Sequence, residues 1–194
     1  MTRQSTTRLV LAGLAVLAAA ACADTNSSDL TPRTPSLSAG SVAKVKKAAG
    51  RKVPVTRSFT RSIDVDHKGG EIKIDEVGFR LTVPKQAIRP QDGTIHMSVT
   101  VLAGSQVAYE FEPSGITFQR PLEFEQDLND IAGDVKSSTV VPEVSYFKSK
   151  QDLDPVNGTA RTYEDIATGL DLSGHTLKAD VWHFSGYIVS WGRR

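Results

Sequence analysis

Residues 72–83 read Ile72-Lys73-Ile74-Asp75-Glu76-Val77-Gly78-Phe79-Arg80-Leu81-Thr82-Val83. On either side of Gly78, large apolar side chains alternate with polar or charged ones. A period of two places the apolar side chains on one face of a β-strand and the polar ones on the other. The segment therefore predicts two half-buried strands.

The same alternation continues along the chain, at Ile95, Met97, Val99 and Val101; Ile116 and Phe118; Leu122 and Phe124; and Leu177, Ala179 and Val181. Prolines that would interrupt a central strand are expected at junctions: Pro84, Pro90, Pro113, Pro121, Pro142 and Pro155. Gly69-Gly70 permits the tight turn of a hairpin, and residues 126–138 and 150–169 are expected to be loop-rich. Many short strands without a long amphipathic helix predict an all-β fold, an antiparallel β-sandwich.

Composition limits the function. The 194 residues hold 23 Lys and Arg against 22 Asp and Glu, which does not suit a strongly basic nucleic-acid-binding protein. With 39% hydrophobic residues, the length fits one domain with additional segments. Cys22 is the single cysteine, so the chain forms no internal disulfide and no cysteine-based metal cluster.

The N-terminus has the pattern of an export signal. Arg3 and Arg8 precede an apolar run, Leu9–Ala21, that is short for a membrane span. Small residues directly before Cys22 resemble the bacterial lipoprotein cleavage box, although Ala19 stands where that family most often has Leu. The resemblance implies a signal peptide over residues 1–21 and acylation of Cys22, with palmitate for example, which anchors the protein to a membrane of the bacterial cell envelope. The alternative is an ordinary cleaved signal with an incidental cysteine.

Residues 22–56 are rich in Ser, Thr, Pro, Ala and Lys and predict a disordered linker, followed by a folded domain over residues 57–194. Eight basic residues and no acidic one fall between Leu30 and Ser62: Arg33, Lys44, Lys46, Lys47, Arg51, Lys52, Arg57 and Arg61. This segment either lies on anionic lipid headgroups or is a solvated linker that its charges keep extended.

Two segments resemble the ZU-5 domain of ankyrins, netrin receptors of the Unc type and a death-domain adaptor. The first is Gly69–Ile74 followed by Val77–Ile88, with a Gly-Gly turn and a strand that ends in Pro84-Lys85-Gln86-Ala87-Ile88. The second is Phe111–Leu122, with Pro113, Gly115, Phe118 and Pro121. The resemblance implies a β-sandwich that binds or scaffolds other proteins and is not a metabolic enzyme.

His183-Phe184-Ser185 matches the tripeptide at which some ZU-5 and related domains cut themselves. The resemblance implies that Ser185 Oγ attacks the carbonyl of Phe184, that His183 assists, and that water opens the resulting ester without a cofactor. Such a cut requires a distorted backbone, and the apolar alternation does change across Trp182–Gly186, as it would at a bulge. The alternative is structural: polar residues at a strand bend beside a core aromatic.

Other chemistry is less well supported. Asp152, Asp154 and Asn157 have an alternating oxygen spacing but do not complete a calcium loop, and the other histidines, His67, His96 and His175, lack paired zinc spacing. We expect no metal and no cofactor. The function expected from sequence is therefore a lipid-anchored envelope protein with a protein partner and no nucleic acid. Self-cleavage is the first alternative, and a carbohydrate- or calcium-binding sandwich is the second.

Overall fold

The structure, a computed structural model, describes residues 42–133, 140–171, 173 and 175–192. Cys22, the expected signal peptide and the first part of the expected linker lie outside these residues. The described strands belong to one compact unit. No helix among the described residues is long and apolar enough to cross a membrane.

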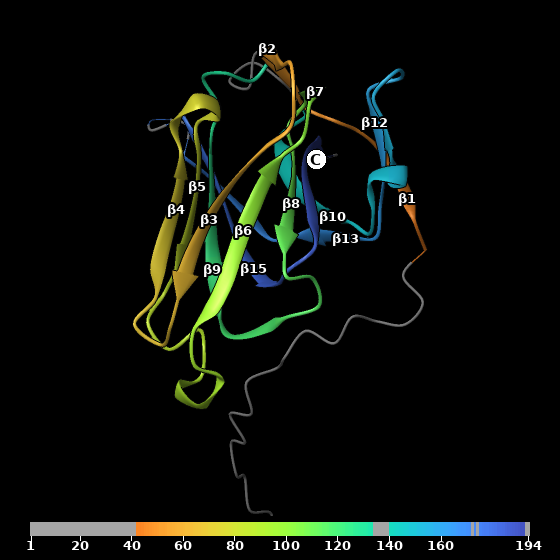
Figure 1. Cartoon of the computed structure of the whole chain (residues 1–194). Helices are drawn as coiled ribbons and strands as arrows, with labels where there is room; N and C mark the ends of the chain where they lie inside the picture. The colour runs from red at the N-terminus through yellow and green to blue at the C-terminus, as the bar shows by residue number, and fades with distance from the viewer. Residues whose placement is uncertain (1–41, 134–139, 172, 174, 193–194) are drawn as a thin grey trace, which may run out of the picture. The chain divides into compact units, whose positions relative to one another are not determined.

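Two antiparallel sheets face each other (Figure 1). The six-stranded sheet has the order β13 (Glu164–Ile166), β10 (Pro142–Phe147), β16 (Gly186–Trp191), β8 (Ala108–Glu112), β6 (Ile95–Val101) and β3 (Phe59–Val65). The five-stranded sheet has the order β14 (Thr168–Asp171), β15 (Thr176–His183), β9 (Thr117–Asp127), β5 (Phe79–Val83) and β4 (Gly70–Ile74). The all-β antiparallel sandwich predicted from the sequence is confirmed.

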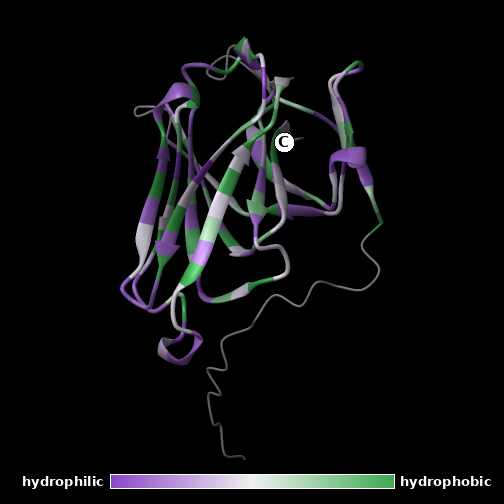
Figure 2. Cartoon of the chain, in the orientation of Figure 1, coloured by the Kyte–Doolittle hydropathy of each residue, from purple (hydrophilic) through white to green (hydrophobic). Residues whose placement is uncertain are grey.

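The core lies between these sheets and consists of the residues whose alternation predicted the strands. The predicted apolar residues of β4, β5, β6 and β15 are buried, apart from partly buried Ile95 at the start of β6. The resulting alternation of apolar and polar residues is visible along the strands in Figure 2. Aromatic rings fill the centre, where Phe79 lies 4.4 Å from Tyr109 and 5.1 Å from Phe124 between ring centroids. Apolar burial between the sheets is therefore what holds them together.

Two small sheets complete the unit. One has the order β1 (Lys44–Lys47), β12 (Thr159–Thr162) and β11 (Leu153–Asp154), and the other pairs β2 (Gly50–Val55) with β7 (Gly104–Gln106). Three short 3-10 helices, η1 (Asp75–Val77), η2 (Pro90–Asp92) and η3 (Lys150–Asp152), lie between strands.

The predicted domain boundary at residue 57 is wrong, because β1 and β2 lie within the expected linker. Ala48 and Ala49, between these two strands, are buried, and Ala49 packs in the main core. Small side chains need little space to be buried, so the absence of large apolar residues did not mean an absence of structure. The expectation of a loop-rich segment over residues 150–169 is also wrong, since β11, β12, β13 and the first half of β14 lie within it.

Two local predictions also change. Gly69-Gly70 does not close a hairpin, because β3 belongs to the six-stranded sheet and β4 to the five-stranded sheet. The turn instead carries the chain between sheets, and Gly69 (φ 82°) is so close to the backbone that a Cβ would lie 2.2 Å from Val83 O. Pro121 lies within β9 instead of at a junction, beside an irregularity in the pairing of β9 with β15.

A buried cation connects β2 to the core. The Arg51 guanidinium lies 5.3 Å from the centre of the Tyr109 ring, and one Nη donates to Tyr109 Oη at 3.4 Å. Its Nε and second Nη are buried without a hydrogen-bond partner. Tyr109 in turn donates to Gln126 Oε1, and Gln126 Nε2 donates to the carbonyl of Val77 at 2.8 Å. Polar groups thus cross the interior from one sheet to the other.

Candidate functional site

The tripeptide His183-Phe184-Ser185 forms the crossing between the two main sheets. His183 ends β15 in the five-stranded sheet, and Gly186 begins β16 in the six-stranded sheet. The peptide bond between Phe184 and Ser185 therefore lies outside both ladders, where the chain changes direction.

His183 is brought to Ser185 by this crossing. The imidazole Nδ1 lies 3.0 Å from Ser185 Oγ, and its Nε2 lies 3.5 Å from a carboxylate oxygen of Glu164 in β13. A carboxylate beside Nε2 favours the tautomer with hydrogen on Nε2, which leaves the Nδ1 lone pair facing the serine hydroxyl. This is the arrangement of a nucleophile, a base and a group that orients the base.

Two tyrosines surround the imidazole. Tyr187 Oη donates to the His183 carbonyl at 2.6 Å and lies 3.2 Å from Nδ1. The Tyr146 ring meets the His183 ring edge to face at 5.2 Å. Burial raises the pKa of both hydroxyls, and hydrogen bonding with Ser185 offsets this only in part. Both tyrosines are therefore protonated at neutral pH. The Tyr187 hydroxyl donates to the His183 backbone carbonyl, and the Tyr146 ring packs against the imidazole.

The carbonyl of Phe184 has a donor of its own. Gly115 N–H donates to Phe184 O at 3.1 Å, and Phe184 N–H donates to Ile116 O at 3.0 Å. Ser185 O accepts from Phe111 N–H at 3.0 Å. The backbone of residues 111–116 thus holds the peptide bond on both sides. Gly115 N–H also stands where negative charge would develop if Ser185 attacked the carbonyl.

Side-chain packing holds the crossing in place. The Phe184 ring lies in the core, 5.0 Å from Phe118 and 5.4 Å from Phe111. Gly186 lies against the Phe147 ring, and a Cβ at Gly186 would be 2.3 Å from a ring carbon. The residues on both sides of Ser185 are therefore fixed by core contacts.

The predicted distortion is present as an interrupted ladder. Val181 pairs with Leu122, but His183 pairs with Thr117, so two residues along β15 correspond to five along β9. The extra residues belong to β9, whereas the sequence suggested a bulge in the strand that carries Ser185. Backbone in the left-handed region does not occur at the tripeptide: the described non-glycine residues with positive φ are Gln86 and His175.

A groove of about 250 Å³ opens on the Glu164 side of the imidazole, lined by Glu164, Asp165, Ile166, Ala167, Asp180, Trp182 and His183. Ser185 itself is partly exposed. Water can therefore reach this region without a rearrangement of the core.

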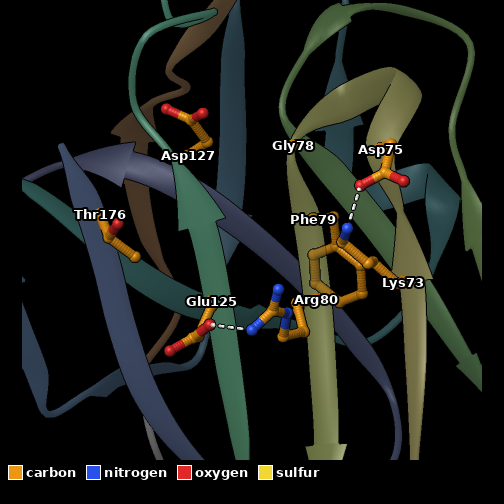
Figure 3. Close-up of a pocket in the computed structure, with 8 residues that line it drawn as sticks. All are labelled: Lys73, Asp75, Gly78, Phe79, Arg80, Glu125, Asp127 and Thr176. Carbon is orange, nitrogen blue, oxygen red and sulfur yellow. Dashed lines mark ion pairs between the residues drawn. The ribbon is translucent and has the colours of Figure 1, made fainter. Parts of the chain in front are cut away.

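Other predicted or possible sites are less complete. A groove on the outer face of the five-stranded sheet (Figure 3) is lined by charged side chains that pair with one another: Lys73 Nζ lies 2.9 Å from Asp75, and Arg80 lies 3.8 Å from Glu125. Asp152 and Asp154 accept hydrogen bonds from nearby backbone N–H groups. In the part of the chain that the structure describes, no three His, Cys, Asp or Glu side chains converge in a way that could hold a metal ion.

Sequence reasoning identified His183, Phe184 and Ser185 but missed the residues around them. Glu164 carries no local signal, because only the sheet brings β13 beside the end of β15. Gly115 was predicted only as part of the second ZU-5-like segment. A buried tyrosine hydroxyl near a histidine needs a partner, and this requirement was the one available clue to Tyr187.

Comparison with known proteins adds no family to this description. No family model matches the chain, and no curated protein matches its sequence. The resemblance to ZU-5 therefore stays a prediction based on two short segments and the tripeptide.

Proposed function

We propose that this chain is a lipid-anchored protein of a bacterial cell envelope whose ZU-5-like sandwich cuts its own backbone once, between Phe184 and Ser185. The observation that supports the cut is the 3.0 Å distance between His183 Nδ1 and Ser185 Oγ where the chain crosses between the two sheets, beside an interruption of the β15–β9 ladder. Export and anchoring rest on the signal pattern that ends at Cys22. The reaction occurs once for each molecule, so the protein is not a turnover enzyme.

The reaction needs only residues of this chain and water. Ser185 Oγ bonds to the Phe184 carbonyl carbon while its proton moves to His183 Nδ1. Negative charge on Phe184 O is stabilised by Gly115 N–H. The carbon–nitrogen bond then breaks, the nitrogen takes the proton from His183, and an ester joins Phe184 to Ser185 Oγ. Water hydrolyses the ester, leaving a carboxylate on Phe184 and a free amine and hydroxyl on Ser185.

Glu164 would act in this reaction as a positioning residue, because it touches the base and not the reacting atoms. With Glu164→Gln, hydrogen on Nε2 is no longer favoured by a negative charge, so the fraction of histidine that can accept a proton at Nδ1 falls. We expect slower cleavage but not its complete loss.

Intact mass spectrometry under denaturing conditions tests the proposal. The sample is the chain from residue 22 with Cys22→Ser, incubated for several days at neutral pH. Self-cleavage yields a new fragment, Ser185–Arg194, that is absent with Ser185→Ala and present with the matched control Ser190→Ala. Hydroxylamine should accelerate the cut before Ser185, because it attacks the ester. It also cleaves Asn-Gly bonds, here Asn157-Gly158, so the fragment to follow is Ser185–Arg194. A single full-length mass in every sample would exclude the reaction.

A second function, a binding or scaffolding module that stays intact, is favoured by a different observation. Ordinary backbone hydrogen bonds hold the peptide on both sides, and Tyr187 fixes His183 through its carbonyl. In this case His183, Ser185 and Tyr187 stabilise the crossing between the sheets, and the protein functions by binding a protein partner. An uncut chain of full stability, together with lower stability for His183→Ala, would support this reading.

A further inference from the structure

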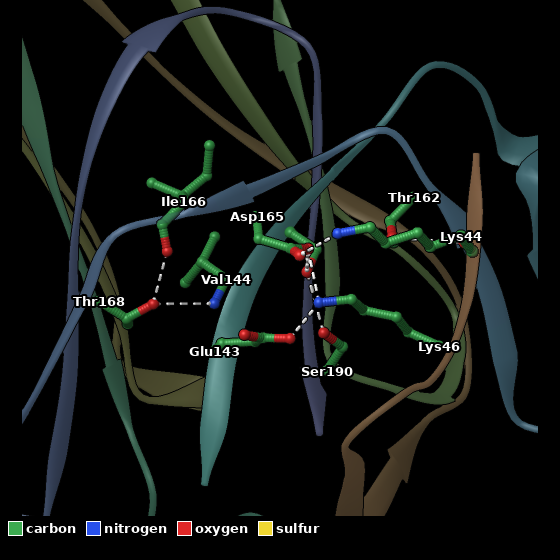
Figure 4. A network of polar contacts seen from close by, with 10 residues as sticks. Lys44, Lys46, Glu143, Val144, Thr162, Asp165, Ile166, Thr168 and Ser190 are labelled. Carbon is green, nitrogen blue, oxygen red and sulfur yellow. Dashed lines mark hydrogen bonds and ion pairs between the residues drawn. The ribbon is translucent and has the colours of Figure 1, made fainter. Parts of the chain in front are cut away.

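The small sheet of β1, β12 and β11 covers the outer face of the six-stranded sheet. A second apolar cluster lies between them, formed by Ala48, Leu102, Ala108, Phe147, Ala160 and Ile188, with Leu153 packed against it. Lys46 points inward from β1, where it contacts Asp165 at 2.5 Å and also pairs with Glu143 (Figure 4). One face of the small sheet is therefore committed to internal contacts.

The opposite face, here called the outer face of the small sheet, carries apolar and basic side chains. Val45 is 74% exposed and is opposite Arg161 in the register, while Lys47 is opposite Thr159. Val156, in the turn between β11 and β12, is 90% exposed, and Val42, just before β1, is 83% exposed. These are three of the four most exposed large apolar residues among those described. Exposed apolar side chains are therefore concentrated around this one sheet.

The strands of the small sheet are also rich in positive charge. Strands β1 and β12 contain four basic residues, Lys44, Lys46, Lys47 and Arg161, and no acidic one. Glu143 and Asp165 lie on the inner side, where they pair with Lys46. Asp154 in β11 is engaged by its own turn, because its carboxylate accepts from Val156 N–H, Asn157 N–H and Asn157 Nδ2. The outer face therefore presents Lys47 and Arg161, which form no ion pair among the described residues, although Lys47 also lines a groove with Glu143 and Asp165.

We propose that the outer face of the small sheet rests on an anionic lipid surface. This inference rests on the proposed anchoring at Cys22, because the lipid fixes which surface lies nearby. Val42 follows Cys22 by only 20 residues, which span at most about 70 Å even when fully extended. Among the described strands, β1 comes first after Cys22 in the sequence, so its sheet is the described part of the fold held closest along the chain. Exposed valines among cations suit the boundary between headgroups and acyl chains.

The combination gives the lipid anchor a second contact. A basic and apolar surface adds membrane affinity to that of the lipid anchor without a protein receptor. Each cation near an anionic surface contributes about fivefold in partitioning. Binding should therefore fall as salt increases, because the charges on both surfaces are screened.

The test uses the unlipidated chain from residue 22 with Cys22→Ser, so it does not depend on whether acylation occurs. Sedimentation with vesicles of phosphatidylglycerol and phosphatidylcholine is compared with pure phosphatidylcholine. The face variant is Val45→Asp with Arg161→Glu. The control is Val53→Asp with Lys85→Glu, which changes the net charge equally at exposed positions outside the small sheet.

We expect binding to the anionic vesicles, at least about tenfold weaker binding for the face variant, and near-normal binding for the control. Urea unfolding of both variants verifies that they are folded. Three results would overturn the proposal: no binding to anionic vesicles, equal binding of the parent and the face variant, or an equal loss in the control. Equal binding of the parent and the face variant would assign the lipid contact to basic residues outside this face. Incorporation of labelled palmitate into the natural chain tests the anchor separately.

Discussion

The glycine after Ser185 offers the sharpest test of how the crossing is built. Gly186 and Phe147 are register partners in β16 and β10, and a Cβ at Gly186 would lie 2.3, 2.5 and 2.6 Å from three carbons of the Phe147 ring. Ordinary carbon contacts are about 3.5–4.0 Å, so the ring would have to move by more than about 1 Å. Phe147 is fully buried and has no space for this movement.

We therefore expect Gly186→Ala to lower the free energy of unfolding by about 3 kcal/mol, the upper end of the range for overpacking a core. The backbone of Gly186 is not in the left-handed region, so the cost should be steric. Urea unfolding of the chain from residue 22, followed by tryptophan fluorescence, measures the change. Gly169→Ala is the matched control, because Gly169 also lies in a strand and a Cβ there meets nothing within 4 Å. It should change stability by less than about 1 kcal/mol.

A double-mutant cycle identifies the cause. Phe147→Ala alone should cost about 3–5 kcal/mol because it leaves a cavity, but in that background Gly186→Ala should cost little. A steric clash with Phe147 is excluded if Gly186→Ala unfolds at the same urea concentration as the parent chain. The clash is also excluded if the effects of the two substitutions on the free energy of unfolding are additive, because the loss would then not come from the Phe147 ring.

Three further predictions concern an ion-paired aspartate, a buried arginine and the anchor. Asp165→Asn should cost about 1–2 kcal/mol at neutral pH. Although burial raises the pKa of Asp165, its ion pairs with Lys46 and Lys44 outweigh this and hold the pKa below its ordinary value. Its contribution is therefore complete above about pH 4 and is lost as the pH falls further, so urea midpoints of parent and variant should converge in acid. Arg51→Met should be neutral or stabilising by up to about 2 kcal/mol, because two buried guanidinium nitrogens have no partner; strong destabilisation would contradict this. Cys22→Ser should abolish incorporation of labelled palmitate in a bacterial host, and retained label would place the acyl group elsewhere.

The strands of the main sheets were predictable because their buried apolar residues recur with a period of two along the sequence. Leu81, Phe124 and Leu177 are each flanked by polar residues and each is fully buried in the core. The small sheet was not predictable in this way. Lys46 is held by ion pairs, Ala49 fills its position with one methyl group, and neither resembles a core residue in isolation.

Long-range pairing explains most of the other errors. Strand β1 forms by pairing with β12, with Lys44 opposite Thr162. The sequence near Lys44 does not indicate this partner. The candidate site shows the same division. The motif identifies Ser185 and His183 because both lie in one tripeptide. Glu164 is distant in sequence, and only the folded sheet brings it close to His183.

The pairing of β16 with its neighbouring strands determines whether the C-terminal fragment stays bound after a cut. The strand lies between β10 and β8, with six register pairs on one side and three on the other, and Gly186–Ser190 are all buried. Cleavage before Ser185 breaks one covalent bond but none of these contacts. Burial of Tyr187, Ile188 and Val189 is worth on the order of 5 kcal/mol, enough to hold the fragment in place. We therefore expect cleaved protein to elute unchanged in native size-exclusion chromatography and to separate into two chains only in denaturant. If the peptide is lost under native conditions while the larger fragment stays folded, strand pairing is not what holds β16.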